Sequence, residues 1–337
     1  MSGHHSILFD TSIATDNAGD EIIMDAVQKE LHNTVGDHFW VRLPTHDYIG
    51  RVGRRWVRDA RFCVVGGTNL LSSNYPKYRQ WKITPIDAVS LAEKVILMGV
   101  GWWQYQNPPD AVTALLYRNI LCRNENIVHS VRDEYTRTML SGIGITNVVN
   151  TGCPTMWSLN AESCKRIPSR RGESVLLTIT DYNKKPDLDR SLIQTLTSRY
   201  REVFAWPQGI GDHAYLRELG LTNLIKPGLH SLDEALSIPG IDYVGTRLHA
   251  GIRALQHGRR SVVIAVDNRA SEISKDTGLW VVQRENPQSL VELLEADTHT
   301  NLSLPEVAIE SWRASMARAL SNAERSRKSS TSLPNFR

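Results

Sequence analysis

The stretch that decides the fold reads GTRLHAGIRALQHG (245–258), and RSVVIAVD (260–267) follows it. Its apolar residues repeat at the spacing of a buried helix, and an apolar run on either side is typical of a buried strand. A helix between two such strands predicts a parallel βαβ unit. Arg247 and His249 stand close together at the start of this helix. A helix buried in a protein core does not need two such polar side chains for packing, so they suggest another role.

The same alternation runs through both halves of the chain. The predicted strands cover 6–13, 39–43, 61–67, 94–101, 126–132 and 146–152, and then 174–180, 202–208, 223–228, 242–247, 261–267 and 280–283. Predicted helices lie between them at 18–33, 48–60, 84–93, 109–122, 133–144, 188–199, 212–220, 231–238, 248–258, 270–277 and 287–296. Strands that alternate with helices predict an α/β fold with two Rossmann-like, doubly wound parallel sheets.

A change in composition separates the two halves. The segment LNAESCKRIPSRRGE (159–173) is polar, basic and poor in apolar residues, so it is predicted as a linker. This places an N-terminal domain at 1–158 and a C-terminal domain at 174–304. A final helix over 305–325 and a disordered tail over 326–337 complete the prediction. Ligands of such sheets bind at the carboxyl ends of the strands, which predicts a site in a cleft between two facing domains.

Composition excludes several classes of protein. The chain has 337 residues, too many for one ordinary core, with 41% hydrophobic and 22% charged residues. Its net charge of +3 gives no sign of a nucleic-acid partner. The four cysteines lack CxxC spacing and are predicted to be reduced thiols, with no zinc site. With no signal peptide and no long apolar run, a cytoplasmic location is expected, while peripheral attachment to a membrane and homo-oligomerisation stay open.

Positive charge at strand ends is the main functional signal. The start of a helix already carries about half a positive charge, so Arg247 and His249 are favourable there if a phosphate or carboxylate docks. Arg132 stands in the same position, after the predicted strand 126–132 and before a helix. An arginine at a helix start needs a compensating anion. The alternative for Arg132 is a salt bridge to a neighbouring acidic residue.

Two turns after strands add candidates of another kind. Asn17 and Asp20 precede the first helix, and Asp20 is predicted either to cap that helix or to meet a substrate hydroxyl. Gly66 and Gly67 end the third strand, where the missing side chains let the backbone approach a ligand or form a plain left-handed turn.

Aromatic and basic segments point to larger partners. Trp102, Trp103 and Tyr105 follow a buried strand, and their flat faces suit sugar rings or an interface between domains. The segment RVGRRWVR (51–58) mixes arginines with Trp56, which is typical of a face exposed to solvent or lying between domains. The functional alternative is that this face contacts anionic lipid.

The ordered set NAGDEII, VVGGTNLL, LMGVG, SVRDEYT, GCPT and GTRLHAGIRALQHGRRSVVIAVD resembles the polysaccharide pyruvyl transferase family over residues 7–285. The chain departs from the family pattern at Thr68, where a third glycine is common, and at Cys153–Pro154, where Asp-Pro is common. Arg269 stands near the place of a frequent lysine.

The resemblance implies a fold like that of B-type glycosyltransferases and transfer of a pyruvyl group from phosphoenolpyruvate to sugar hydroxyls, commonly as a cyclic ketal. The acceptor would be an exopolysaccharide, a cell-wall polymer or a lipid-linked precursor. Phosphoenolpyruvate is then the co-substrate, with no cofactor and no metal. Its binding residues carry over to Arg132, Arg247, Leu248 and His249, and an acidic residue of the first loop carries over to Asp20.

These observations give a hypothesis for the roles of the residues. Arg132 and Arg247 grip the donor with Leu248, Gly66 and Gly67, His249 is the general acid, and Asp20 accepts a hydroxyl proton. On the acceptor side, the candidates are Asn17, Trp102, Trp103 and Tyr105. Two alternatives remain open: a nucleotide-sugar glycosyltransferase, for which Asp267 and Glu272 are available, and a non-catalytic glycan-binding protein.

Overall fold

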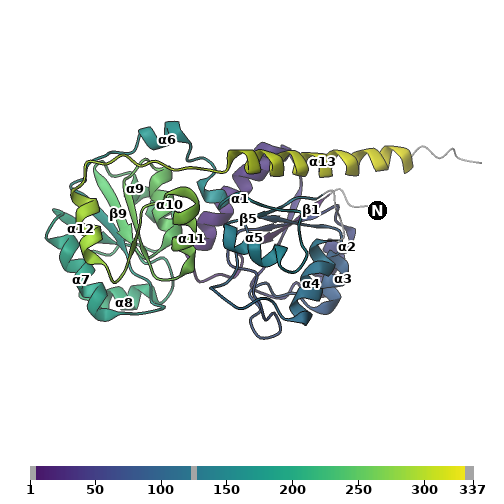
Figure 1. Ribbon diagram of the computed structural model, residues 1–337, viewed down its shortest axis with the longest axis horizontal. Coiled ribbons are helices and arrows are strands. Elements are labelled where there is room, and N and C mark those ends of the chain that lie inside the picture. Colours follow the sequence, from purple (N-terminus) through teal and green to yellow (C-terminus); the bar gives the residue numbers. More distant parts are fainter. Residues whose placement is uncertain (1–4, 123–126, 331–337) are drawn as a thin grey trace, which may run out of the picture. The chain divides into compact units, whose positions relative to one another are not determined.

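The computed structural model describes residues 5–122 and 127–330, with side chains up to residue 320. The chain forms two compact units: Met1–Ala14, Met24–Pro154 and Pro305–Arg337 make unit 1, while Thr15–Ile23 and Thr155–Leu304 make unit 2 (Figure 1). The main boundary therefore follows Pro154, and the short segment Thr15–Ile23 joins unit 2 although the predicted N-terminal domain contained it.

Unit 1 is built on a parallel sheet in the order β2-β1-β3-β4. A parallel pair, β5 and β6, continues from β4, because the amide of Gly99 donates to the carbonyl of Ser130 at 3.0 Å and Val100 bridges to Val131. The strands are β1 (Ser6–Asp10), β2 (Trp40–Pro44), β3 (Cys63–Gly66), β4 (Val95–Met98), β5 (His129–Val131) and β6 (Val148–Asn150).

Helices follow the strands of unit 1 as the alternation predicts. They are α1 (Ala18–Val35), α2 (Gly50–Asp59), α3 (Pro85–Leu91), α4 (Ala111–Leu121) and α5 (Glu134–Ser141). Asp110 and Asp133 cap α4 and α5 by accepting the amides of Thr113 and Thr136 at 2.7 Å each. The first turns of α4 and α5 thus have their amides satisfied locally.

Unit 2 holds a five-stranded parallel sheet in the order β11-β10-β9-β7-β8. Its strands are β7 (Ser174–Thr178), β8 (Glu202–Ala205), β9 (Ile241–Gly245), β10 (Ser261–Ala265) and β11 (Val281–Gln283). Its helices are α6 (Ala161–Lys165), α7 (Pro186–Thr197), α8 (Asp212–Glu218), α9 (Leu229–Leu236), α10 (Leu248–Gln256), α11 (Asn268–Thr277) and α12 (Pro287–Glu295). The fold is thus α/β with two parallel-sheet units, as predicted; a cleft shared by the units stays a prediction.

Two predicted segments have a different structure. A short 3-10 turn at Pro154–Met156 precedes the predicted linker 159–173, which itself contains the capped helix α6. Three residues of this segment are buried in unit 2: Leu159, Cys164 and Ile167. The predicted strand 223–228 forms only a single bridge, from Leu224 to Ala205. Pro227 lacks an amide hydrogen and so ends the pairing.

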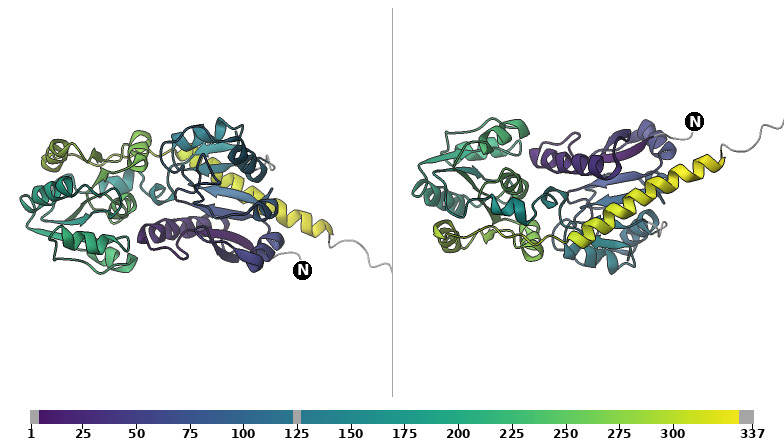
Figure 2. Two further views of the ribbon diagram at one scale, coloured as in Figure 1. Left: turned by 90° about the horizontal axis from the view of Figure 1, so that it is seen from below. Right: turned by 90° about the horizontal axis from the view of Figure 1, so that it is seen from above.

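The last helix, α13 (Glu306–Ser330), returns to unit 1 and lies against its strands (Figure 2). The indole Nε1 of Trp312, which is fully buried, donates to the carbonyl of Leu97 at 3.1 Å, and Arg313 forms an ion pair with Glu30 at 2.6 Å. The helix is longer than predicted and includes 326–330; residues 331–337 of the predicted tail lie outside the described residues. No helix among the described residues is long and apolar enough to cross a membrane.

A buried histidine predicts how unit 1 responds to acid. His129 on β5 accepts the amide of Leu97 at Nδ1 and donates from Nε2 to the carbonyl of Leu121, and burial lowers its pKa to about 4. The contribution of neutral His129 to the free energy of unfolding is complete above the unfolded pKa of about 6.5 and is lost as pH falls towards 4. Between pH 7 and pH 5 the free energy of unfolding falls by about 2 kcal/mol from this cause. In His129→Gln, which keeps one donor and one acceptor, the melting temperature should fall less between these pH values than in the wild type. An equal fall in both would contradict this role.

Candidate active site

Arg247 lies where β9 ends and α10 begins, at the carboxyl edge of the sheet of unit 2. Its amide donates to Thr178 Oγ1 at 3.3 Å, and its carbonyl accepts the hydroxyl of Tyr243 at 2.6 Å. Gly245, just before it, has no room for a side chain, since a Cβ there would lie 2.3 Å from Thr178 Oγ1. The close pairing of β7 with β9 therefore fixes the backbone that presents Arg247.

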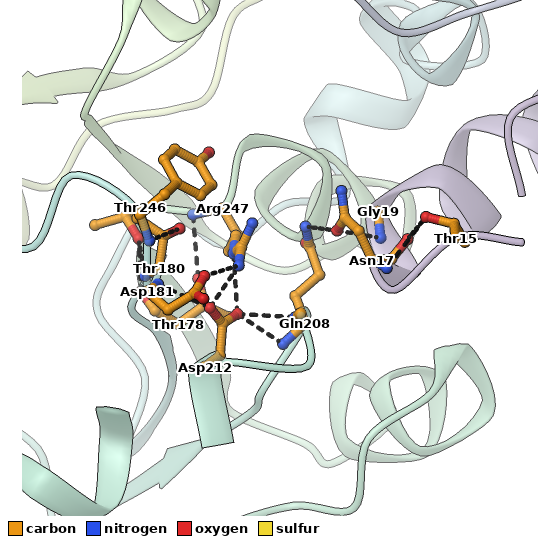
Figure 3. A network of polar contacts seen from close by, with 12 residues as sticks. Thr15, Asn17, Gly19, Thr178, Thr180, Asp181, Gln208, Asp212, Thr246 and Arg247 are labelled. Atoms are coloured by element: carbon orange, nitrogen blue, oxygen red, sulfur yellow. Dashed lines mark hydrogen bonds and ion pairs between the residues drawn. The ribbon is translucent and has the colours of Figure 1, made fainter. Parts of the chain in front are cut away.

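The guanidinium of Arg247 is paired with two carboxylates. It makes a bidentate contact with Asp212, with Nε 3.0 Å from Oδ2, and Nη2 lies 3.3 Å from Oδ1 of Asp181 (Figure 3). Its Cζ also lies 4.9 Å from the centre of the Tyr182 ring. The sequence predicted that Arg247 binds an anionic ligand, whereas in the structure it already contacts the carboxylates of Asp181 and Asp212.

The two carboxylates of this cluster differ in environment. Asp212 is fully buried and also accepts the amides of Asp181 at 2.9 Å, Gln208 at 3.1 Å and Gly209 at 2.9 Å. The side chain of Asp181 is 37% exposed, and its pKa is raised by partial burial and by the charge of Asp212, against the opposing effect of Arg247. Asp212 therefore positions the arginine, while the raised pKa of Asp181 favours its protonated form.

The start of α10 has no side-chain cap. Arg247 is its N-cap residue. Leu248 and His249 occupy its first two positions and are buried. Its first amides and the helix dipole thus favour a negative group.

The first loop belongs to the same network. The amide of Ala18 donates to the carbonyl of Gln208 at 2.9 Å, and Gln208 Nε2 donates to Oδ1 of Asn17 at 2.8 Å (Figure 3). Asn17 Oδ1 also accepts the amide of Gly19 at 3.0 Å, so Asn17 caps α1. A hydrogen-bonded chain thus runs from Asn17 through Gln208 and Asp212 to Arg247.

Asp20 lies in the first turn of α1 and is buried. Its Oδ2 accepts the hydroxyl of Thr15 at 2.7 Å. The capping role that the sequence left open for Asp20 falls to Asn17, which leaves Asp20 as a buried carboxylate next to the Arg247 network.

Arg132 is the second predicted arginine, and it lies in unit 1. It is 1% exposed, and its Nε contacts Oδ2 of Asp133 at 3.1 Å, which is the salt bridge foreseen as an alternative. Its Nη1 and Nη2 are buried with no hydrogen-bond partner among residues 5–122 and 127–330. Buried N–H groups without partners are costly, so this guanidinium is suited to an incoming anion.

Gly101 makes room for that guanidinium. A Cβ at this position would lie 2.3 Å from Cζ of Arg132, a distance that real atoms do not reach. Any side chain at position 101 therefore displaces the guanidinium of Arg132.

The glycine turn after β3 has structural reasons that the sequence did not reveal. A Cβ on Gly66 would lie 3.1 Å from Met24 and Val27 of α1, so the missing side chain lets α1 pack closely against β3. The amide of Gly67 already donates to the carbonyl of Met98 at 2.9 Å. Packing and turn formation are thus sufficient reasons for both glycines, and their donor-binding role stays a prediction. Thr68 has φ of 59°, a strained conformation for a β-branched residue.

The three aromatic residues after β4 separate into two groups. Trp102 is fully buried, and its Nε1 donates to Ser73 Oγ at 3.2 Å and Gln106 Oε1 at 3.1 Å, so the prediction that it contacts an acceptor is wrong. Trp103 is half-buried and packs on Tyr78 with ring centres 4.8 Å apart. Tyr105 is 56% exposed.

Tyr105 lines an open pocket with a volume of about 620 Å³, which is within the usual range for small-molecule sites. The pocket lies in unit 1, in the loops after β3 and β4, and its lining is mostly polar: Ser73, Asn74, Tyr105, Gln106, Asn107, Pro108 and Asp110. An exposed aromatic ring among amide and carboxyl groups suits a carbohydrate.

The decisive comparison is with protein families. The family model described as polysaccharide pyruvyl transferase matches residues 17–268, which include Asn17, Asp20, Arg132, Arg247 and His249. The chain belongs to this family. The matched region of this pyruvyl transferase contains both predicted arginines, Arg132 and Arg247.

Other comparisons are more distant. Among curated proteins, none matches this pyruvyl transferase. Among solved structures, the UDP-GlcNAc 2-epimerase of Methanocaldococcus jannaschii is similar at 12% identity over 88% of this chain and 94% of that chain, with a TM-score of 0.49. The lipopolysaccharide outer core galactosyltransferase WaaB is similar at 8% identity over 96% and 99%, with a TM-score of 0.46.

The carboxylates considered for a nucleotide-sugar transferase have other partners in this pyruvyl transferase. Asp267 caps α11 and forms an ion pair with Arg269, and Glu272 forms one with Lys275 at 2.6 Å. Arg269 also contacts the hydroxyl of Tyr182, so it borders the Arg247 cluster.

Sequence reasoning missed the acidic partners of Arg247. Asp181 and Gln208 come three residues after the ends of β7 and β8, and Asp212 begins α8. The rule that the carboxyl ends of parallel strands meet at one edge points to these loops, but it does not give the pairing of Asp181 and Asp212 with Arg247.

Proposed function

We propose that this pyruvyl transferase moves the pyruvyl group of phosphoenolpyruvate onto hydroxyls of a sugar, forming a ketal. The acceptor would be an exopolysaccharide, a cell-wall polymer or its lipid-linked precursor, modified in the cytoplasm. The family match supports the transferred group. The observation that carries the choice of donor is the buried guanidinium of Arg132, whose two amino groups lack partners.

Arg132 and the start of α10 after Arg247 each suit an anionic group. Phosphoenolpyruvate carries a phosphate and a carboxylate, and a guanidinium binds either with paired hydrogen bonds, which an ammonium group cannot do. Arg132 offers Nη1 and Nη2. Arg247 keeps Nε and Nη2 on Asp212, while the uncapped start of α10 beside it offers backbone amides. This division needs no metal ion to neutralise the phosphate.

Asp181 sets the condition under which an anion can approach Arg247. With both carboxylates ionised, the cluster of Arg247, Asp181 and Asp212 carries a net charge of −1, which repels a phosphate. One proton on Asp181 makes the cluster neutral, and the raised pKa of Asp181 favours this state. Donor binding is therefore accompanied by proton uptake in this proposal.

Asp181→Asn mimics that protonated state. We expect the variant to bind phosphoenolpyruvate at least about threefold more tightly than the wild type at pH 8, because one like charge near the phosphate is gone. The advantage should be smaller at pH 5 than at pH 8, because the raised pKa of Asp181 brings the wild-type carboxyl closer to taking up its own proton. Calorimetric titration at both pH values measures it; weaker binding by the variant at pH 8 would contradict the charge argument.

The chemistry then needs one proton delivered to carbon. Protonation of C3 of phosphoenolpyruvate gives a methyl group and positive charge at C2, which the first acceptor hydroxyl attacks. The C2–O bond to phosphate breaks, and a second hydroxyl closes the ketal. Of the two hydroxyl protons, one replaces the proton given to C3 and the other leaves with phosphate. His249 is proposed as the acid and Asp20 as the acceptor of a hydroxyl proton.

His249 has a test that separates catalysis from packing. If His249 delivers the proton, His249→Ala should lower turnover by about a hundredfold or more, where about a hundredfold is the lower end of the range for general acids, with a small change in melting temperature. A packing role predicts a lower melting temperature and unchanged turnover per folded molecule. Both quantities are to be measured on the same preparation.

The acceptor is proposed to bind against Tyr105 in the pocket of unit 1. The ring would stack on a sugar, and Asn107 and Asn74 would supply hydrogen bonds at its edge. Trp103, packed on Tyr78, would support this loop rather than meet the sugar itself.

The test of the function is a product assay. The enzyme is incubated with phosphoenolpyruvate and a panel of lipid-linked and model glycosides, and mass spectrometry looks for an added pyruvyl group together with release of phosphate. Nucleotide sugars without phosphoenolpyruvate form the second arm. Glycosyl transfer in that arm, with no pyruvylated product in the first, would replace this proposal with the glycosyltransferase alternative.

A further inference from the structure

Helices α2, α3 and α4 lie side by side in unit 1 (Figure 1). Contacts join α2 to α3 and α3 to α4. Each helix buries one face towards the sheet: Gly53 and Val57 from α2, Ala88 and Leu91 from α3, and Ala114 and Tyr117 from α4. Their opposite faces therefore form one continuous outer surface.

That outer surface is apolar. It displays six large hydrophobic side chains that are 43% to 73% exposed, at helical spacing of three or four residues: Val52, Trp56, Ile86, Val89, Val112 and Leu115. They are half of the twelve exposed large hydrophobic side chains in the described part of the chain. Single exposed apolar residues are ordinary, but a group on three adjacent helices marks an interaction surface.

The same surface is basic. Arg51, Arg55 and Arg58 of α2 and Arg118 of α4 are exposed, against the acidic side chains of Asp59 and Glu93. Arg54, by contrast, forms an ion pair with the buried side chain of Asp87 at 2.9 Å. Arginines beside exposed Trp and Val side chains are the composition of helices that lie in the interface of an anionic bilayer.

Charge also decides between two occupants. A second copy of this chain docked through the same face by a two-fold axis would bring its arginines against those of the first copy. An anionic bilayer instead offers phosphates to the arginines and acyl chains to the six apolar residues.

We propose that the outer face of α2, α3 and α4 binds the surface of an anionic lipid bilayer, with the helices parallel to the membrane plane. The inference is independent of the proposed reaction, because it uses neither the donor arginines nor the pocket at Tyr105. It fits an acceptor carried on a lipid, which would then be met at the membrane surface.

Vesicle co-sedimentation of the full chain tests the proposal without any substrate. Binding is expected to vesicles of phosphatidylcholine with 30% phosphatidylglycerol, and to be at least about tenfold weaker with phosphatidylcholine alone. Arg51→Glu/Arg55→Glu and Val89→Ser/Leu115→Ser should each lower the partition coefficient at least about tenfold. All four positions are exposed, so circular dichroism should remain that of the wild type.

A matched control uses apolar residues exposed elsewhere. Ile210 and Val307 are 80% and 87% exposed, and Ile210→Ser/Val307→Ser should bind the vesicles like the wild type. Equal loss in the control, or no binding by the wild type, would overturn the proposal. A dimer in light scattering that Val89→Ser/Leu115→Ser converts to a monomer, with no vesicle binding, would assign the face to a second copy instead.

Discussion

Arg247→Ala is expected to lower turnover at least about a hundredfold, the usual scale for loss of one preorganised charge donor. Arg247 lies between Asp212 and the uncapped start of α10, where its positive charge offsets two carboxylates that would repel the proposed donor. The steady-state rate per folded molecule measures the effect.

Stability has to be separated from this effect. Removing Arg247 leaves Asp212 buried and unpaired, which costs about 3–5 kcal/mol of stability. The double variant Arg247→Met/Asp212→Asn removes both partners and should recover much of the melting temperature while turnover stays low. Near-normal turnover in a folded Arg247 variant would contradict the donor assignment.

Arg132→Met is expected to have a loss of similar size. Its two buried amino groups have no partner in the described chain, so an anion is the group most able to satisfy them. The variant should lose at least about a hundredfold in turnover and should no longer gain melting temperature when phosphoenolpyruvate is added.

A second variant tests the same guanidinium without removing it. Gly101→Ala places a Cβ where the guanidinium of Arg132 lies and should lower turnover as well. Gly142→Ala is the matched control, because its Cβ would have no neighbour closer than 3.4 Å. If Gly101→Ala were as active as the control, the position of Arg132 would not matter for turnover.

Local patterns predicted most of the elements correctly. The alternation of apolar runs and helical periods depends on neighbouring residues, so nearly all predicted helices and strands are present in the structure. The resemblance found the family, which the match over 17–268 confirms. The helix start at Arg247 was also predicted from its immediate neighbours.

Contacts between distant segments were beyond the reach of these patterns. The joining of Thr15–Ile23 to unit 2 depends on the loop at Gln208, some 190 residues away in sequence. Trp102 is buried because Ser73 and Gln106 satisfy its indole, which its own aromatic neighbours do not reveal. The pairing of Arg247 with Asp212 likewise joins two strand ends that only the sheet order brings together.

The most direct test of the proposed donor-binding roles of Arg132 and Arg247 is calorimetric titration of phosphoenolpyruvate into the wild type, Arg132→Met and Arg247→Lys. The account predicts saturable binding of one molecule per chain in the wild type and at least about tenfold weaker binding in each variant. Equal affinity in all three proteins, or no binding by the wild type, would contradict it.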